Sequence, residues 1–263
     1  FTHKNANEPN FWLTSESENK ICMKEKIALL YGVFFFSIVY AQEEPVKIEG
    51  YAQGTTYHIT YFEKDNRNYQ PEIEKILTDF DQSVSTYSPT SIISRINANE
   101  KDVIVDKYFI ACFNKAKEVW KNTNGAFDPT VYTLVNMWGW GPGKKKKIEK
   151  QKIDSVLKFV GFQLITLKGN QVIKKDPRVA LDFNAFAQGY SVDVVGNFLN
   201  SKGISSYIVE IGGEVYAKGK KPDGDNWKIG IEKPIDNQDS INPLKAIAKL
   251  ENMAIATSGN YRK

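Results

Sequence analysis

The segment that most constrains this chain runs from Leu181 to Gly219. It begins with an apolar stretch ending at the acid Asp182 and continues through a small polar turn into an amphipathic helix. A second strand follows and stops abruptly at Gly212-Gly213. A strand that enters a helix through small residues forms an anion site, because unpaired N–H groups of the helix N-terminus face the turn. The segment therefore predicts a nucleotide-phosphate site, where the paired glycines let a second backbone come close.

Patterns elsewhere in the chain predict an α+β fold. Residues 46–62 alternate apolar and polar side chains around Gln53-Gly54-Thr55, which predicts a hairpin or a bulged strand. Residues 85–97 are expected to form a loop, and residues 125–143 a loop interrupted by a short helix. The mixture favours a mixed, largely antiparallel sheet with packed helices. Further helices are expected near 71–85, 106–123, 148–160 and 187–201, and further strands near 163–167, 171–174, 179–183, 205–211, 214–219, 226–232 and 245–251.

Residues 23–41 have the organisation of a secretory signal peptide: basic residues, an apolar run and the small-residue site Val39-Tyr40-Ala41. The apolar run is too short for a comfortable membrane span. Residues 1–22 are polar, unpatterned and precede Met23, so we expect them not to belong to the natural protein. The mature domain then covers residues 42–263 and is exported, to the periplasm or the outer face of the cytoplasmic membrane. No cysteine stands at the cleavage site, so a lipid anchor is not expected.

Composition argues against several classes of protein. The formal net charge of +4 is mild and does not favour nucleic-acid binding. The mature chain keeps one cysteine, Cys112, which excludes an internal disulfide. Its apolar helical neighbours predict a buried structural thiol. The histidines, His3 and His58, support neither a transition-metal cluster nor a catalytic triad.

The motif at 125–130 places Asp128 between an aromatic residue and a proline. An ordinary turn in which Asp128 caps the following segment explains the motif by itself. Alternatively, Asp128 and nearby backbone groups hold a polar ligand while Phe127 covers a ring. Tyr87 likewise either stacks on a planar ring or is an ordinary exposed loop tyrosine. Ser258 belongs either to a simple β-turn or to a loop that offers its hydroxyl to a phosphate or flavin.

Asp182, Ala185 and Gln188 follow one another at spacings of three. If the helix begins near Asn184, all three face one ligand at its N-terminus. The competing explanation is that Asp182 or Asn184 is a simple N-cap. A hard cation suits this place, because Mg²⁺ takes carboxylate, backbone carbonyl and phosphate oxygens.

Taken together and in this order, the motifs of this chain resemble those of the ApbE family, the FAD:protein FMN transferases. The matching segments span almost all of residues 42–263. They are QGTTYHI (53–59), STYSPTSIISRIN (85–97), NGAFDPTVYTLVNMWGWG (124–141), LDFNAFAQGYSVD (181–193), VEIGGEVYAKG (209–219), WKIGIEKP (227–234) and AIATSGNYR (254–262).

The resemblance implies a reaction in which a threonine hydroxyl of an exported or membrane-bound redox protein attacks the FMN phosphorus of FAD. AMP leaves and FMN stays attached by a phosphoester bond, while Mg²⁺ neutralises charge on the pyrophosphate. The alternative is a protein that binds FAD without chemistry, or an FAD pyrophosphatase that needs no acceptor.

Residue by residue, the resemblance implies contacts to the flavin nucleotide from several motifs, and it implies that the backbone carbonyl of Ala185 binds Mg²⁺. Gln53 stands where many members carry methionine. Gln188 replaces a commoner charged residue, so a charge-based role is not supported there. The expected nucleotide contacts are Gln53, Tyr87, Ala126, Phe127, Asp128, Asp182, Gln188 and Ser258.

In the family, the Ala-Thr-Ser-Gly segment is followed by an H-x-x-D-P motif and by an Ala-Asp segment that carries side-chain ligands of Mg²⁺. This sequence stops at Lys263, before both. We therefore expect it to be a fragment whose catalytic residues lie beyond Lys263, and we assign none within it.

Overall fold

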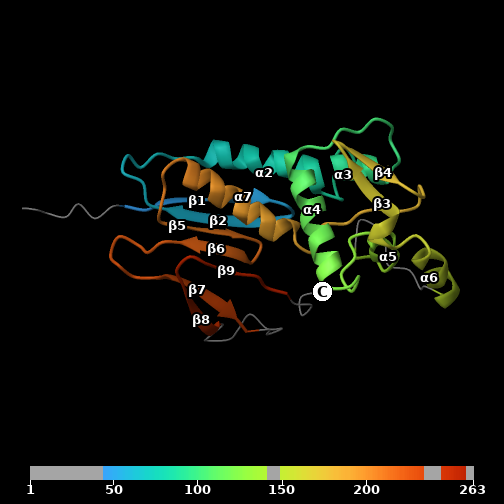
Figure 1. Cartoon of the computed structure of the whole chain (residues 1–263). Coiled ribbons are helices and arrows are strands. Elements are labelled where there is room, and N and C mark those ends of the chain that lie inside the picture. Colours follow the sequence, from blue (N-terminus) through green and yellow to red (C-terminus); the bar gives the residue numbers. More distant parts are fainter. Residues whose placement is uncertain (1–43, 141–148, 234–243, 259–263) are drawn as a thin grey trace, which may run out of the picture. The chain divides into compact units, whose positions relative to one another are not determined.

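An antiparallel five-stranded sheet forms the centre of the domain in the computed structural model. The structure describes residues 44–140, 149–233 and 244–258. In spatial order the strands are β1 (Val46–Ala52), β2 (Thr55–Tyr61), β5 (Tyr207–Ile211), β6 (Glu214–Lys218) and β9 (Met253–Ile255) (Figure 1). The register places Ile59 opposite both Ile48 and Val209, all of them buried. Because side chains alternate along a strand, this register gives the sheet one continuous apolar face.

Two helices cover that apolar face, α2 (Gln70–Val84) and α7 (Ala187–Ser201) (Figure 1). Apolar residues recur along α2 at helical spacing, and Ile73 and Leu77 pack against the sheet. The opposite face of the sheet is covered at β6 by a hairpin of β7 (Trp227–Glu232) and β8 (Leu244–Leu250).

A second core surrounds α4 (Lys107–Asn122). Phe109 in this helix lies edge-on to Phe183, with ring centroids 5.4 Å apart. Cys112 is also buried here, and burial raises the pKa of its thiol to about 12, which confirms the predicted structural thiol. The other elements on this side are α3 (Ile92–Asn97), α5 (Tyr132–Met137), α6 (Lys150–Leu157), the 3₁₀ turn η1 (Phe162–Leu164), β3 (Ile165–Lys168) and β4 (Gln171–Lys174).

The tight hairpin turns follow from the sequence. Gln53 and Gly54 connect β1 to β2 with φ of 55° and 74°, and Gly212 and Gly213 connect β5 to β6 with φ of 57° and 94°. Positive φ at both central residues is the twist that a two-residue hairpin requires, and glycine adopts it without strain.

The predicted α+β class is confirmed, and two local predictions are wrong. The strand expected at 179–183 is a single parallel bridge between Ala180 and Val131, because no neighbouring strand runs beside it in the described residues. The loop expected at 85–97 contains α3, which begins where the Ser91 hydroxyl accepts a hydrogen bond from the Ser94 amide at 3.1 Å. The proposed signal peptide and upstream segment lie outside the described residues and stay predictions.

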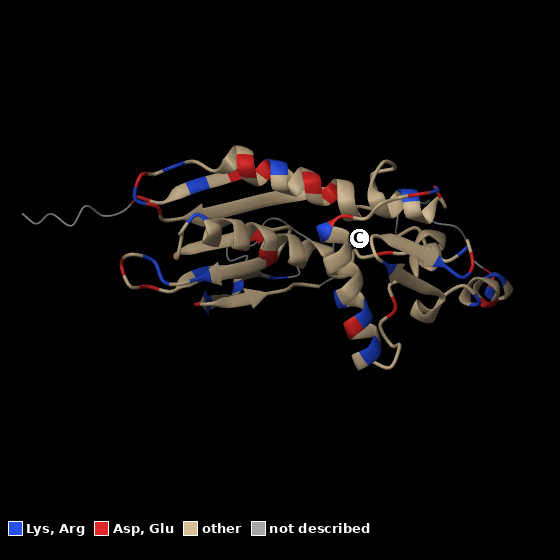
Figure 2. Cartoon of the chain, turned by 45° about the horizontal axis from the view of Figure 1, so that its top comes forward, with Lys and Arg blue, Asp and Glu red and all other residues tan. Residues whose placement is uncertain are grey.

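In Figure 2, acidic and basic residues alternate along the ribbon rather than gathering in separate parts of the chain. This distribution agrees with the mild net charge. None of the helices within the described ranges is both long and apolar enough to cross a membrane.

We predict that Phe183→Ala destabilises the domain by about 3–5 kcal/mol, because it empties a fully buried aromatic site. Tyr51→Ala is the matched control: this ring is 74% exposed, and its loss is expected to cost less than about 0.5 kcal/mol. Urea unfolding monitored by circular dichroism measures both. Equal effects of the two substitutions would contradict the packing described for Phe183.

Candidate functional site

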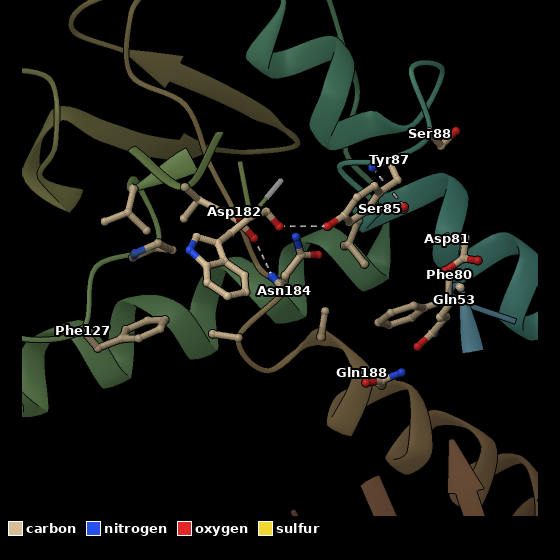
Figure 3. Close-up of a pocket in the computed structure, with 18 of the residues that line it drawn as sticks. Gln53, Phe80, Asp81, Ser85, Tyr87, Ser88, Phe127, Asp182, Asn184 and Gln188 are labelled. Carbon is tan, nitrogen blue, oxygen red and sulfur yellow. Dashed lines mark hydrogen bonds between the residues drawn. The ribbon is translucent and has the colours of Figure 1, made fainter. Parts of the chain in front are cut away.

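A cleft of about 1150 Å³ lies where the end of α2, the turn at 126–129 and the segment 182–188 meet. In Figure 3, Asp182 and Asn184 occupy its centre, Phe127 lies to one side, and Gln53, Phe80 and Asp81 lie to the other. All but one of the residues expected to contact the nucleotide or metal line this cleft. They are Gln53, Tyr87, Ala126, Phe127, Asp128, Asp182, Ala185 and Gln188.

The segment that carries Asp182 is pinned without belonging to a sheet. The side-chain amide of Asn97 donates to the Leu181 carbonyl and accepts from the Leu181 amide, both at 2.8 Å. The Asp182 amide donates to the Pro129 carbonyl at 2.7 Å. Asn97 therefore satisfies the backbone groups that a neighbouring strand would otherwise pair.

Asp182 is only 8% exposed, and burial raises the pKa of its carboxyl group. Its Oδ1 accepts a hydrogen bond from the Asn184 amide at 2.7 Å. The amides of Phe186 and Ala187 donate to the Phe183 carbonyl at 3.1 and 2.8 Å, which closes a turn over residues 184–186, and α7 begins at Ala187. The helix expected at 187–201 is therefore confirmed, and the alternative start near Asn184 is not found. Neither Asp182 nor Asn184 caps α7, whose N-cap is Phe186.

The first turn of α7 offers free backbone donors to the cleft. Among the described residues, no acceptor bonds the amides of Gln188 or Gly189. The carbonyl of Ala185 likewise has no donor in the described part of the chain, and this residue is exposed. Unpaired helix N–H groups attract anions, whereas an unpaired carbonyl oxygen suits a hard cation such as Mg²⁺.

Asp128 shapes the wall of the cleft through bonds to the protein itself. Its Oδ1 accepts hydrogen bonds from the Thr130 amide at 2.8 Å and the Thr130 hydroxyl at 2.5 Å. Its Oδ2 accepts from the Phe162 amide at 2.9 Å. These bonds are those expected if Asp128 stabilises an ordinary turn. Asp128 also lines the cleft, and its contact with the nucleotide stays a prediction.

Gln53 and Tyr87 approach the cleft from two loops. Ser191 Oγ lies 3.2 Å from Gln53 Oε1 and donates to the Gln188 carbonyl at 2.7 Å, so it connects the β1–β2 turn to α7. The Tyr87 ring is 61% exposed, and its hydroxyl donates to the Trp140 carbonyl at 3.3 Å. The exposed ring is available for stacking on a planar ligand.

Ser258 is the one predicted contact that does not line the cleft. It is exposed and is the last residue before the undescribed 259–263. Its neighbour Thr257 donates to the Gly213 carbonyl at 3.3 Å, which places the segment behind the β5–β6 turn. The contact of Ser258 with the nucleotide stays a prediction.

Several lining residues were not predicted, among them Phe80, Asp81, Asn184 and Trp140. Asp81 could have been found, because it follows Leu77 by four residues and so falls on the core-facing stripe of α2. A carboxylate on that stripe needs an explanation. Burial raises its pKa, and a hydrogen bond from the Gln53 amide partly opposes the shift.

The charged side chains found in the lining of the cleft are acidic. Asp81, Asp128 and Asp182 are among its lining residues, whereas no Lys, Arg or His is found in the lining that the structure describes. The described residues also contain no cluster of three His, Cys, Asp or Glu side chains able to hold a metal. Any cation here would thus depend on single protein oxygens, such as the Ala185 carbonyl, and on oxygens of the ligand.

We predict that Asp182→Asn makes the metal-free, nucleotide-free protein more stable at pH 7 than the unsubstituted protein. The raised pKa means that the folded state binds a proton more tightly than the unfolded state. The free energy of unfolding therefore decreases as pH rises through the range in which Asp182 loses its proton. Asparagine carries no charge and removes this decrease, and its side-chain oxygen can still accept a hydrogen bond from the Asn184 amide.

Urea unfolding at several pH values between about 3.5 and 7 measures the effect, since free aspartate titrates near 4. The gain should shrink on acidification. Asp154→Asn, on the exposed surface of α6, controls for the loss of a carboxylate. A gain that does not change with pH would contradict the buried charge.

Comparison with known proteins shows the family of this chain. The sequence pattern of the ApbE family matches residues 53–263. An FAD:protein FMN transferase from Vibrio cholerae is 36% identical over 227 residues, which are 83% of this chain and 67% of that protein. A protein of the same name from Haemophilus influenzae is 35% identical over 259 residues, 91% of this chain and 74% of that protein.

Solved structures agree as well. Flavin transferase ApbE from Vibrio cholerae matches with a TM-score of 0.73 at 34% identity, over 83% of this chain and 72% of that one. The apo form of the Pseudomonas stutzeri flavinyl transferase ApbE matches with a TM-score of 0.73 at 31% identity, over 84% and 73%. The resemblance predicted from the motifs is confirmed: this chain belongs to the ApbE family.

Proposed function

We propose that this protein transfers FMN from FAD to a threonine hydroxyl of an acceptor protein, with Mg²⁺ as cofactor and AMP as the product released. The observation that carries the proposal is the cleft of about 1150 Å³, into which the fold brings motif residues from four separate segments. Its volume suits a dinucleotide, since sites for drug-sized ligands range from about 300 to 1,000 Å³.

The charge of the cleft supports a metal-dependent reaction. The pyrophosphate of FAD is anionic, and the described lining holds Asp81, Asp128 and Asp182 without a basic side chain. Binding one anion beside others is unfavourable unless a cation lies between them. Mg²⁺, held in part by the Ala185 carbonyl and by phosphate oxygens, would neutralise the charge that develops on the leaving phosphate.

In the proposed reaction, the threonine Oγ forms a bond to the FMN phosphorus while the pyrophosphate P–O bond to AMP breaks. AMP leaves with the bonding electrons, and the hydroxyl proton of the threonine is released to the solvent. The chain positions the reactants: the free amides of Gln188 and Gly189 donate to phosphate oxygens at the positive end of α7. Positioning and electrostatic stabilisation together supply almost all of a protein's contribution to phosphoryl transfer.

The aromatic residues around the cleft support binding of the ring systems. Phe127 lies at one side of the cleft, and Tyr87 and Trp140 also line it. Planar rings gain from stacking on such side chains in addition to the area they bury.

Export of the protein is part of the same proposal and rests on the pattern of residues 23–41. The acceptor is then a threonine-bearing domain of an exported or membrane-bound redox protein.

We expect full-length protein incubated with FAD, Mg²⁺ and such an acceptor to attach FMN covalently, seen as in-gel flavin fluorescence and as an FMN mass increase on the acceptor. Chelation of the metal should abolish labelling, and so should replacement of the acceptor threonine by valine. Release of AMP without an acceptor would indicate a hydrolase, and tight binding of unreacted FAD would indicate a carrier. Either result without labelling would contradict the transferase.

We expect Gln188→Lys to tighten FAD binding in the absence of Mg²⁺ by about fivefold, because it places a positive charge beside the pyrophosphate in a cleft without one. Gln188→Met, of similar length without charge, is the matched control. The proposal about charge would be wrong if both variants bound FAD alike, or if the gain did not weaken at high salt.

A further inference from the structure

We propose that Glu210 is a positioning residue for the nucleotide cleft. From outside the cleft, it fixes the Gly212-Gly213 turn against Gln188 at the start of α7. The inference rests on the proposed function, because it assigns Glu210 an effect on binding of the nucleotide.

Both carboxylate oxygens of Glu210 are engaged. Glu210 lies on β5 directly opposite His58 on β2, and its Oε2 is 2.7 Å from His58 Nδ1. Its Oε1 accepts a hydrogen bond from the Gly213 amide at 2.6 Å. The Glu210 side chain is 22% exposed and that of His58 56%, so the carboxylate is the better shielded of the pair. Hydrogen bonds to a charged, partly buried acceptor are among the stronger ones in proteins.

The turn held by Glu210 is packed directly against Gln188. A Cβ built on Gly212 would overlap with Gln188 Nε2 and lie 2.7 Å from Thr55 Cγ2. Because no gap separates the Gly212 backbone from these side chains, a shift of the turn must displace Gln188 or leave it unsupported.

Hydrogen bonds hold both glycines of this turn, and the Gly212 amide donates to the Thr56 carbonyl at 3.1 Å. Strand pairing fixes its ends at Ile211 and Glu214, and glycine at the two positions between them has the largest conformational entropy of any residue. The Gly213 amide is bonded to Glu210, and the Gly213 carbonyl to the Thr257 hydroxyl. These two bonds restrict the peptide groups that pairing leaves free.

The effect reaches the cleft through Gln188. This residue lines the cleft and carries one of the free amides of α7, whereas Glu210, Gly212 and Gly213 are not among the lining residues that the structure describes. Glu210 therefore acts on the nucleotide through another residue. In this proposal, the Gly212-Gly213 turn holds Gln188 in its position at the phosphate site.

The test compares Glu210→Ala with Glu210→Gln, whose side-chain oxygen can still accept from the Gly213 amide. We expect Glu210→Ala to raise the dissociation constant and KM for FAD about three- to tenfold with little change in kcat, and Glu210→Gln to restore both. Melting temperatures establish that each variant is folded. Should Glu210→Ala not fold, Glu210→Asp replaces it, since the shorter carboxylate loses its reach to Gly213 and should raise the dissociation constant similarly.

A double-mutant cycle with Gln188→Ala identifies the route. If Glu210 acts through Gln188, the alanine substitution at 210 should have little further effect on FAD binding once Gln188 is removed. Additive effects, or an unchanged dissociation constant in folded Glu210→Ala, would overturn the proposal. FAD binding is measured directly by flavin fluorescence, so this test does not depend on whether the protein transfers FMN. An inactive unsubstituted protein that binds FAD would contradict the proposed function and leave the role of Glu210 testable.

Discussion

The site depends on how residues 179–188 are held between the two cores of the domain. This segment carries Asp182, Ala185 and Gln188, and the amide of Asn97 pairs both backbone groups of Leu181. Phe183 then anchors the chain among the aromatic residues around α4. The Asn97 side chain thus pairs backbone groups that a neighbouring strand would pair, and the buried Phe183 ring fixes the position of the chain. The residues that follow turn toward the cleft.

The electrostatics of the cleft follow from that arrangement. The segment presents a buried carboxylate together with a carbonyl and helix N-terminal amides that have no partner among the described residues, all within a few positions of one another. Such a combination has donors for phosphate oxygens and an acceptor for a cation, but it has no basic side chain of its own. In the proposed function, the phosphate oxygens of FAD would bind the metal, and the metal would neutralise the charge of the phosphates, so each would strengthen the binding of the other.

Much of this could be predicted from the sequence where local chemistry decides the structure. Positive φ explains Gln53-Gly54 and Gly212-Gly213 as hairpin turns, and helical spacing predicts α2 and α7 closely. The failures have a non-local cause. The apolar run at 179–183 has the composition of a strand, and only the distant Asn97 and Val131 decide that it pairs through a side chain and a single bridge. Asp81 and Glu210 were missed because their importance depends on neighbours far away in sequence.

One cleft gathers motif residues from separate segments, and in the proposed function it binds a flavin dinucleotide. A crystal structure of the protein with FAD and Mg²⁺ would show this binding. We expect the pyrophosphate at the N-terminus of α7 beside Ala185 and Gln188, with Asp182 and Tyr87 in contact with the nucleotide. A dinucleotide bound at another surface, with this cleft filled only by solvent, would contradict this expectation.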